Sequence, residues 1–312
     1  MNFKSDAVVL TVYCMTYNHE NYIEKTLQSF VSQQTNFRFK VIVHDDASTD
    51  NTAEIVKKYA EKYPDIIYPI FQTENKYSKH IPIFDDYIKP ELEGEYIAVC
   101  EGDDYWCDSN KLQMQYDYME AHPECALCVH NTKMIDVNDN ELGRLFNKNK
   151  IDKDYTTGEI ILAGGGGLFH TSSFFLRKEA RLAMPDAFKI KGVGDYPLSI
   201  WLSIAGKHIH YIGKVMSAYR VNTPFSWSVK IHSSKEKILS SLDNIIDGIK
   251  QMDQYTEFKY HKSFCERMNF LEYNKIVVNR RWNQIVLNPK YWGLFLFSMI
   301  KKLCKIFGYQ TD

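Results

Sequence analysis

The feature that most constrains the fold is an alternation of short apolar, β-branched runs with amphipathic stretches along the first hundred residues. The pattern predicts strands at 7–15, 39–44, 66–71 and 95–100, and helices at 20–33 and 52–63. Strands that alternate with helices are typical of a parallel, doubly wound sheet covered by helices. We therefore expect an α/β protein, with further strand runs at 126–130 and 174–177.

Length and charge restrict the class of protein further. The chain has 312 residues, 45% of them hydrophobic, which is enough for one large α/β domain with an appendage. Lys and Arg number 38 against 39 Asp and Glu, so the chain as a whole carries no charge excess that would attract nucleic acid. No nucleic-acid partner is expected.

Cysteine usage and the apolar runs favour a cytoplasmic protein. The seven cysteines are an odd number, and the spacing of Cys125 and Cys128 favours buried free thiols over a zinc site because no second pair follows. The first residues are interpreted as a strand rather than a signal peptide. No run of about 18 apolar residues occurs, so no ordinary transmembrane helix is expected.

Polar clusters follow three of the predicted strands, at 16–18, 45–46 and 101–104. In open α/β sheets, ligands bind beyond the carboxyl ends of the strands. We therefore expect the three clusters to meet in one crevice.

Residues 7–135 resemble the nucleotide-binding half of family-2 glycosyltransferases. The resemblance rests on Thr16-Tyr17-Asn18 after the first strand, on VIVHDDASTDNT after the second, and on EYIAVCEGDDYWCDSNKL around the fourth. It implies a GT-A fold, with a mainly parallel central sheet flanked by helices in residues 1–222. These would divide into a nucleotide-binding half, 7–135, and an acceptor or catalytic half, 136–222, followed by a helical C-terminal region, 223–312.

The activity that the resemblance implies is inverting transfer of a sugar from a nucleotide-diphosphate donor, with a UDP-sugar favoured. The group moved would be a hexosyl or N-acetylhexosaminyl unit. The acceptor would be a hydroxyl of a glycan or of a lipid-linked saccharide of a bacterial surface polysaccharide.

The family's D-x-D position is occupied here by Glu101-Gly102-Asp103. Mg²⁺ or Mn²⁺ suits carboxylate and phosphate oxygens, so the resemblance implies Asp103 as the metal ligand and Glu101 as a ribose or outer contact. Asp104 is expected beside them. Glu in place of the first Asp departs from the pattern and leaves the metal geometry open, and a solvated turn whose acids cap a helix is the alternative.

The donor nucleotide is assigned to the first two polar clusters. Asp46 matches the carboxylate that accepts a hydrogen bond from the base, and Tyr17 the aromatic side chain beside it. The alternative is that Asp45 caps the next helix and Tyr17 only packs. The residues expected to bind the donor are Thr16, Tyr17, Asn18, Glu20, Asp45, Asp46, Glu101, Asp104 and Arg220, the last as a basic residue beside the pyrophosphate.

The catalytic base is expected in the loop 192–197, where Asp195 occupies the family's position. An inverting transfer needs one carboxylate to accept the proton of the acceptor hydroxyl. The alternative is that Asp195 caps a helix over 198–205. His170 and Asp186 are the next candidates for the base, and the glycines at 164–167 are expected to let backbone approach a substrate.

The C-terminal segment allows two interpretations. An apolar run at 293–300 lies between Arg280, Arg281 and Lys290 on one side and Lys301, Lys302 and Lys305 on the other. This is typical of an amphipathic helix in the membrane interface at the inner face of the cell membrane. A helix packed on the domain or on a second subunit, which would give a homo-oligomer, explains the same pattern.

Two other functions remain open from the sequence. A nucleotidyltransferase shares acidic metal ligands on an α/β nucleotide fold, although the chain lacks an early Gly-rich phosphate loop. A non-catalytic protein that binds nucleotide sugars on the same fold is the second alternative.

Overall fold

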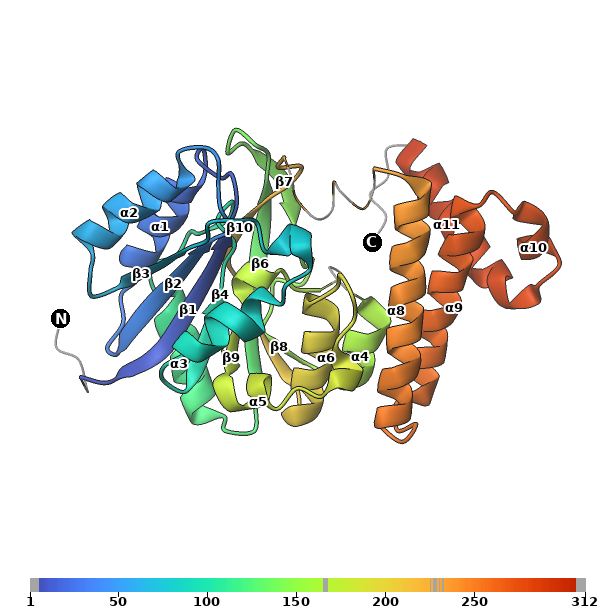
Figure 1. The fold of residues 1–312 in the computed structure, drawn as a ribbon. Helices are drawn as coiled ribbons and strands as arrows, with labels where there is room; N and C mark the ends of the chain where they lie inside the picture. The colour runs from blue at the N-terminus through green and yellow to red at the C-terminus, as the bar shows by residue number, and fades with distance from the viewer. Residues whose placement is uncertain are drawn as a thin grey trace.

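The computed structural model describes residues 6–164, 168–224, 226, 229, 231 and 233–306 (Figure 1). Its strands are β1 (Val8–Thr16), β2 (Arg38–Asp45), β3 (Ile67–Phe71), β4 (Tyr96–Val99), β5 (Tyr105–Trp106), β6 (Leu127–Ile135), β7 (Glu141–Leu145), β8 (Lys153–Tyr155), β9 (Phe175–Arg177) and β10 (Ile209–Arg220). Its α-helices are α1 (Ile23–Val31), α2 (Thr52–Lys62), α3 (Lys111–Ala121), α4 (Thr157–Ala163), α5 (Lys178–Leu182), α6 (Asp195–Ala205), α8 (Lys235–Tyr255), α9 (His261–Val278), α10 (Trp282–Val286) and α11 (Trp292–Ile306). Gly165–Gly167, in the predicted substrate-approach loop, lie outside the described residues.

The first half of the sheet is parallel, as predicted. The strands run in the order β3-β2-β1-β4, and every pairing among them is parallel. Helix α1 buries Ile23, Leu27 and Phe30, which lie on one face because they are spaced by three or four residues. Figure 1 shows α1 and α2 side by side against these strands. The α/β class is confirmed.

The second half of the sheet is mixed, which the strand pattern alone does not show. Strand β9 lies between β4 and β6 and is antiparallel to both, while β10 is parallel to β6. Strands β5, β7 and β8 add antiparallel pairs to β10 or β6. Antiparallel strands can follow short connections, whereas parallel ones need a crossover.

Helices α8 and α9 form a hairpin that packs on the second half of the sheet domain (Figure 1). Ile246 and Met252 of α8 and Phe264 of α9 share one buried cluster with Phe188 and Tyr196. A Cβ on Gly248 of α8 would lie 2.4 Å from the Ile190 side chain, so α8 approaches this region closely. The boundary predicted near residue 222 marks a change from sheet to helices, but the two parts share a core. The division into domains stays a prediction.

The described cysteines, Cys304 apart, are free thiols, and both Cys125 and Cys128 are buried. Over the residues whose placement is given, no helix is both long enough and apolar enough to cross a bilayer.

Candidate active site

An acidic turn, Glu101 to Asp104, leaves the buried strand β4 at its carboxyl end. The Gly102 N–H donates to the carbonyl of Met15 in β1 at 3.0 Å, so the turn lies against the end of the first strand. A Cβ on Gly102 would lie 2.6 Å from Thr16 Oγ1 and 2.9 Å from His19 Nδ1. Glycine therefore allows the two flanking carboxylates to approach the first polar cluster so closely.

The second polar cluster joins the same region. The N–H of Asp46 donates to the carbonyl of Thr16 at 3.0 Å, and the N–H of Asn18 donates to Ser48 Oγ at 2.9 Å. The three clusters predicted from the strand ends thus lie together at one edge of the sheet.

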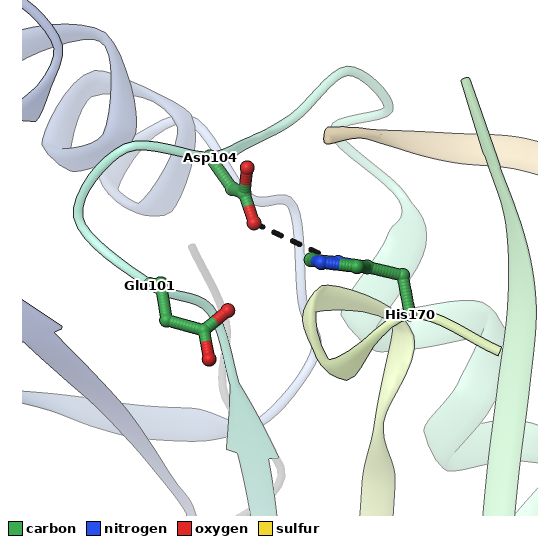
Figure 2. Close-up of side chains that lie close together, drawn as sticks. All are labelled: Glu101, Asp104 and His170. Atoms are coloured by element: carbon green, nitrogen blue, oxygen red, sulfur yellow. Dashed lines mark ion pairs between the residues drawn. The ribbon is translucent and has the colours of Figure 1, made fainter. Parts of the chain in front are cut away.

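The two aspartates of the turn have different partners. Asp103 Oδ2 accepts a hydrogen bond from Thr223 Oγ1 at 2.7 Å and lies 4.0 Å from His19 Nε2. Asp104 is buried, and its Oδ1 accepts the N–H of Arg220 at 2.9 Å. Its Oδ2 lies 3.6 Å from Nδ1 of His170 (Figure 2).

Glu101, Asp104 and His170 offer a set of candidate metal ligands. Each provides one ligand atom, and these atoms all lie within 4.8 Å of one another. Figure 2 shows the two carboxylates extending from the acidic turn toward the imidazole, which comes from the segment that precedes η4 (Thr171–Ser173). The imidazole stacks on Tyr219, with ring centroids 4.1 Å apart, and its Nδ1 lies 2.8 Å from Ser172 Oγ, so its position is well defined. Oxygen and imidazole ligands together suit Mn²⁺, and the oxygens suit Mg²⁺.

The electrostatics of this group fit a divalent cation. Burial, with the charges of Asp103 and Asp195, raises the pKa of Glu101 to about 7 against the lowering effect of the hydrogen bond from Thr171. Burial and the charges of Asp103 and Glu101 raise the pKa of Asp104 well above its usual range. Burial lowers the pKa of His170 to about 4, so its ring is neutral at physiological pH and able to coordinate. A cation would relieve the repulsion between these carboxylates.

Sequence reasoning considered His170 only as a substitute base and did not connect it to the metal. Thr223 and His19 were likewise not connected with Asp103, because both lie far from it in the sequence. A single histidine in a polar stretch carries no ligand signal until the fold places it beside a carboxylate.

Asp195 is the first residue of α6, three residues before the start expected from the sequence. The residue at the N-cap is Gly194, and the Asp195 carboxylate accepts the N–H of the adjacent Tyr196 at 2.8 Å. The charge of Asp195 contributes to the raised pKa of Glu101. The role of Asp195 as base stays a prediction.

Arg220, at the end of β10, is buried beneath the acidic turn. Its guanidinium donates from Nε to the carbonyl of Asp103 at 3.0 Å, from Nη1 to the carbonyl of Asp136 at 3.1 Å, and from Nη2 to Asp139 Oδ1 at 2.7 Å. It also lies over the ring of Tyr22, 4.5 Å from the centroid. The guanidinium is thus hydrogen-bonded to the acidic turn and to residues 136 and 139. Its expected contact with a pyrophosphate stays a prediction.

Asn18 and Glu20 connect the first two loops. Asn18 Oδ1 accepts the N–H of Thr49 at 2.8 Å, and Glu20 Oε2 accepts the N–H of Asn51 at 3.0 Å. Thr16 is buried, with its hydroxyl 3.2 Å from His19 Nδ1. These hydrogen bonds hold together the two loops that would line the nucleotide site. The expected contacts of these residues with a donor stay predictions.

Asp45 and Asp46 are both buried but differ in their surroundings. Asp45 accepts hydrogen bonds from the hydroxyl and N–H of Ser48 at 2.5 and 3.1 Å, and burial raises its pKa. Asp46 accepts the N–H groups of Lys76 and Tyr77 at 2.7 and 3.0 Å. Each carboxylate oxygen of Asp46 keeps a second lone pair for a base N–H. Tyr17 is half-buried on the neighbouring turn.

Two relatives illustrate the sequence similarity of this chain. The uncharacterized protein Mb1547 of Mycobacterium bovis is 40% identical over 126 residues, which are 40% of this chain and 36% of that protein. The putative teichuronic acid biosynthesis glycosyltransferase TuaG of Bacillus subtilis is 31% identical over 111 residues, which are 36% of this chain and 42% of that protein. The matches thus span about a third to two fifths of the length of these relatives.

Solved structures share the fold. TarS 1-349 of S. aureus in complex with UDP-GlcNAc superposes with a TM-score of 0.60 at 18% identity, covering 90% of this chain and 76% of that chain. The mannosyltransferase PcManGT of Pyrobaculum calidifontis, in complex with GDP-Man and Mn²⁺, superposes with a TM-score of 0.59 at 14% identity, covering 96% and 82%. At these identities the likeness concerns the fold alone.

The sequence model of one family, described as glycosyl transferase family 2, matches residues 11–181. This match includes β1 to β4, the acidic turn and His170, and ends before Asp195. Because it covers more than half of the 312 residues, the chain belongs to glycosyl transferase family 2.

Proposed function

We propose that the chain is a metal-dependent, inverting glycosyltransferase that moves a hexosyl or N-acetylhexosaminyl unit from a UDP-sugar to a hydroxyl of a glycan or lipid-linked saccharide. The observation that carries the proposal is the gathering of Glu101, Asp103, Asp104 and His170 at the edge of a family-2 fold. The family match favours sugar transfer over the nucleotidyl transfer that the sequence left open.

The metal would be held by Glu101, Asp104 and His170, with Asp103 beside them. The ligand role expected for Asp103 from the resemblance stays a prediction. Mn²⁺ or Mg²⁺ bound there would supply positive charge to neutralise a leaving nucleotide diphosphate. The crowding that raises the pKa of Glu101 to about 7 supports the assignment, because a site for a cation needs this excess of negative charge. The complex of PcManGT with GDP-Man and Mn²⁺ gives a precedent on the same fold.

The uridine would lie between the first two loops. Asp46 is buried at the carboxyl end of β2, and a carboxylate accepts the N–H that uracil has and cytosine lacks. Tyr17 would stack or pack beside the base. TarS crystallises with UDP-GlcNAc on a similar fold, which supports a UDP-sugar for this chain.

Asp195 would act as the general base. Two observations support this role: Asp195 begins α6 without being its N-cap, and its charge contributes to the raised pKa of Glu101. General-base catalysis requires this carboxylate to be ionised and within hydrogen-bond reach of the acceptor hydroxyl. The similarity to TuaG, a putative teichuronic acid biosynthesis glycosyltransferase, supports a surface polysaccharide as the acceptor.

The test is release of nucleotide diphosphate from a panel of UDP-, GDP- and dTDP-sugars, with Mn²⁺ and then with excess chelator. Turnover is expected with a UDP-sugar and should cease on chelation. In parallel, thermal stability with UDP is measured with and without Mn²⁺. Stabilisation by UDP that does not depend on the metal, together with no turnover of any donor, would favour the non-catalytic binding protein instead.

A further inference from the structure

We propose that the C-terminal segment is a docking surface for an anionic lipid bilayer. The surface, here called the tail surface, consists of Trp282, Val286, Leu287, Trp292, Leu296 and Phe297. Each of these side chains is at least 49% exposed, and Leu287 is 79% exposed. The proposal concerns binding and is independent of the reaction.

Exposed apolar side chains are concentrated in this segment. Of nineteen large apolar side chains that lie exposed in the described part of the chain, eight fall between Trp282 and Met299. The others are scattered from Tyr68 to Phe270. Single exposed apolar residues are normal, but a contiguous group marks an interaction site.

The segment that carries the tail surface is folded against α9. Its apolar side chains are therefore exposed although the segment itself is packed. Ile285 and Tyr291 are buried against Tyr273 of α9, in a cluster separate from the main core. The hydroxyl groups of Tyr273 and Ser298 lie 2.9 Å apart, which joins α11 to α9. One face of α10 and α11 therefore rests on the hairpin, while the side chains of the tail surface are 49–79% exposed.

The positive charge of the C-terminal segment indicates which partner would bind the tail surface. Residues 273–311 contain seven Lys and Arg and no Asp or Glu, in a chain with 38 basic and 39 acidic residues overall. Arg280, Arg281 and Lys290, which border the tail surface, are all exposed. A second copy of the chain would bring the same positive charges to the interface and be repelled. An anionic bilayer offers negative headgroups to the basic residues and an apolar layer to the tryptophans, phenylalanines and leucines.

The location of the tail surface relates it to the acidic turn. Strand β10 ends at Arg220, which touches the turn, and α8 begins at Lys235, soon after it. Because α9 returns alongside α8, its end lies at the start of α8, where Ser234, Lys235 and Arg280 line a shared hollow. Figure 1 shows α10 and α11 beside the hairpin, on the side away from the sheet. The segment that carries the tail surface thus begins at the end of the hairpin where the chain arrives from β10.

The test is co-sedimentation of the full chain, without any donor, with vesicles of phosphatidylcholine alone and of phosphatidylcholine mixed equally with phosphatidylglycerol. Binding is expected only with phosphatidylglycerol and should weaken as salt is added. Trp292→Ser with Leu296→Ser should lower the partition coefficient roughly tenfold or more, since two apolar side chains no longer enter the bilayer. Arg281→Gln with Lys290→Gln should lower it about fivefold for each charge removed.

Matched controls use exposed residues elsewhere. Ile151→Ser with Leu162→Ser, and Lys207→Gln with Lys262→Gln, should leave binding unchanged. The proposal is overturned if the wild-type chain does not bind phosphatidylglycerol vesicles at low salt, or if tail and control variants bind equally well. It is also overturned if light scattering shows a wild-type dimer that the tail variants dissociate. A blue shift of wild-type tryptophan fluorescence on adding these vesicles would support it without any variant, because Trp282 and Trp292 lie on the tail surface.

Because vesicle binding is measured in the absence of donor, its failure would leave the proposed transferase activity untouched. Conversely, a chain that transfers no sugar could still bind vesicles.

Discussion

The sheet domain and the C-terminal tail both contain amphipathic helices, but the apolar faces of these helices are buried to different extents. Helix α1 buries Ile23, Leu27 and Phe30 completely against the sheet, whereas α11 leaves Trp292 and Leu296 more than half exposed. The carboxylates gather in the first region, and the second has none between residues 273 and 311. An apolar helical face is therefore buried only where the fold supplies a sheet to receive it, and elsewhere it needs another partner.

The strongest way to break this comparison is to remove one carboxylate from the acidic region. Asp195→Asn keeps the shape of the side chain but cannot accept the proton of an acceptor hydroxyl. We expect kcat to fall by about 10²–10⁴-fold with the KM for the donor nearly unchanged. Asp186→Asn, whose side chain is 93% exposed, is the matched control and should have normal kinetics. If Asp195→Asn retains more than about a tenth of the wild-type rate, the base lies elsewhere.

Arg220 tests whether the acidic turn needs a buried cation to hold it. Arg220→Lys loses the fork that reaches Asp103, Asp136 and Asp139, so the free energy of unfolding should fall by about 2–3 kcal/mol. Urea unfolding measures this change. Asp139→Asn keeps a hydrogen-bonding side chain there and should cost less. An unchanged stability combined with a raised KM for the donor would instead support direct contact between Arg220 and the pyrophosphate.

The pH dependence of metal binding tests whether the gathered carboxylates bind a cation. The pKa of Glu101 is raised in the folded protein, from 4.5 to about 7, so the metal-free protein loses stability as the pH rises through this window. A bound cation favours the ionised carboxylate and reverses that loss. The rise in Tm produced by Mn²⁺ should therefore be larger at about pH 8 than at about pH 6.

Glu101→Gln should flatten the pH dependence measured in that experiment. Asp104 has a pKa raised in the same direction and will contribute a residual slope in the variant. An Mn²⁺ effect that is equal at both pH values in the wild-type protein would show that these carboxylates are not the ligands.

The smallest effect is expected in the tail. Leu296→Ser removes an apolar side chain that is 62% exposed, so the free energy of unfolding should change by less than about 0.5 kcal/mol. Leu271→Ala in α9, where the side chain is 2% exposed, should cost about 2–5 kcal/mol. Chemical denaturation of both variants gives the difference. A large cost for Leu296→Ser would mean that the tail surface is covered in solution.

Local patterns predicted the parallel half of the fold well. The β-branched runs and the spacing of apolar residues placed β1 to β4 and α1 and α2 to within a few residues, because each signal is local. The start of α6 was placed three residues too late; Pro197 lies in its first turn, where proline is tolerated. The antiparallel insertion of β9 between β4 and β6 was not predicted, because pairing partners are chosen by tertiary contacts.

The candidate site was predicted only in part from the sequence. The acidic turn stood out because four residues in a row after a buried strand follow a known family pattern. His170 did not, since it reaches Asp104 only through the path of the chain between α4 and β9. The buried position of Arg220 was not predicted either, because its partners Asp136 and Asp139 lie more than 80 residues away in the sequence.

The core that α8 and α9 share with the second half of the sheet domain has a practical consequence for dividing the protein into fragments. A fragment that ends near residue 222 would leave Phe188, Tyr196 and Ile190 without the helices that cover them. Such a fragment should aggregate even though it contains the whole sheet. A fragment that ends after α9, near residue 280, keeps this core and removes only α10 and α11, so it offers the shortest version of the chain in which catalysis could be studied apart from the tail surface.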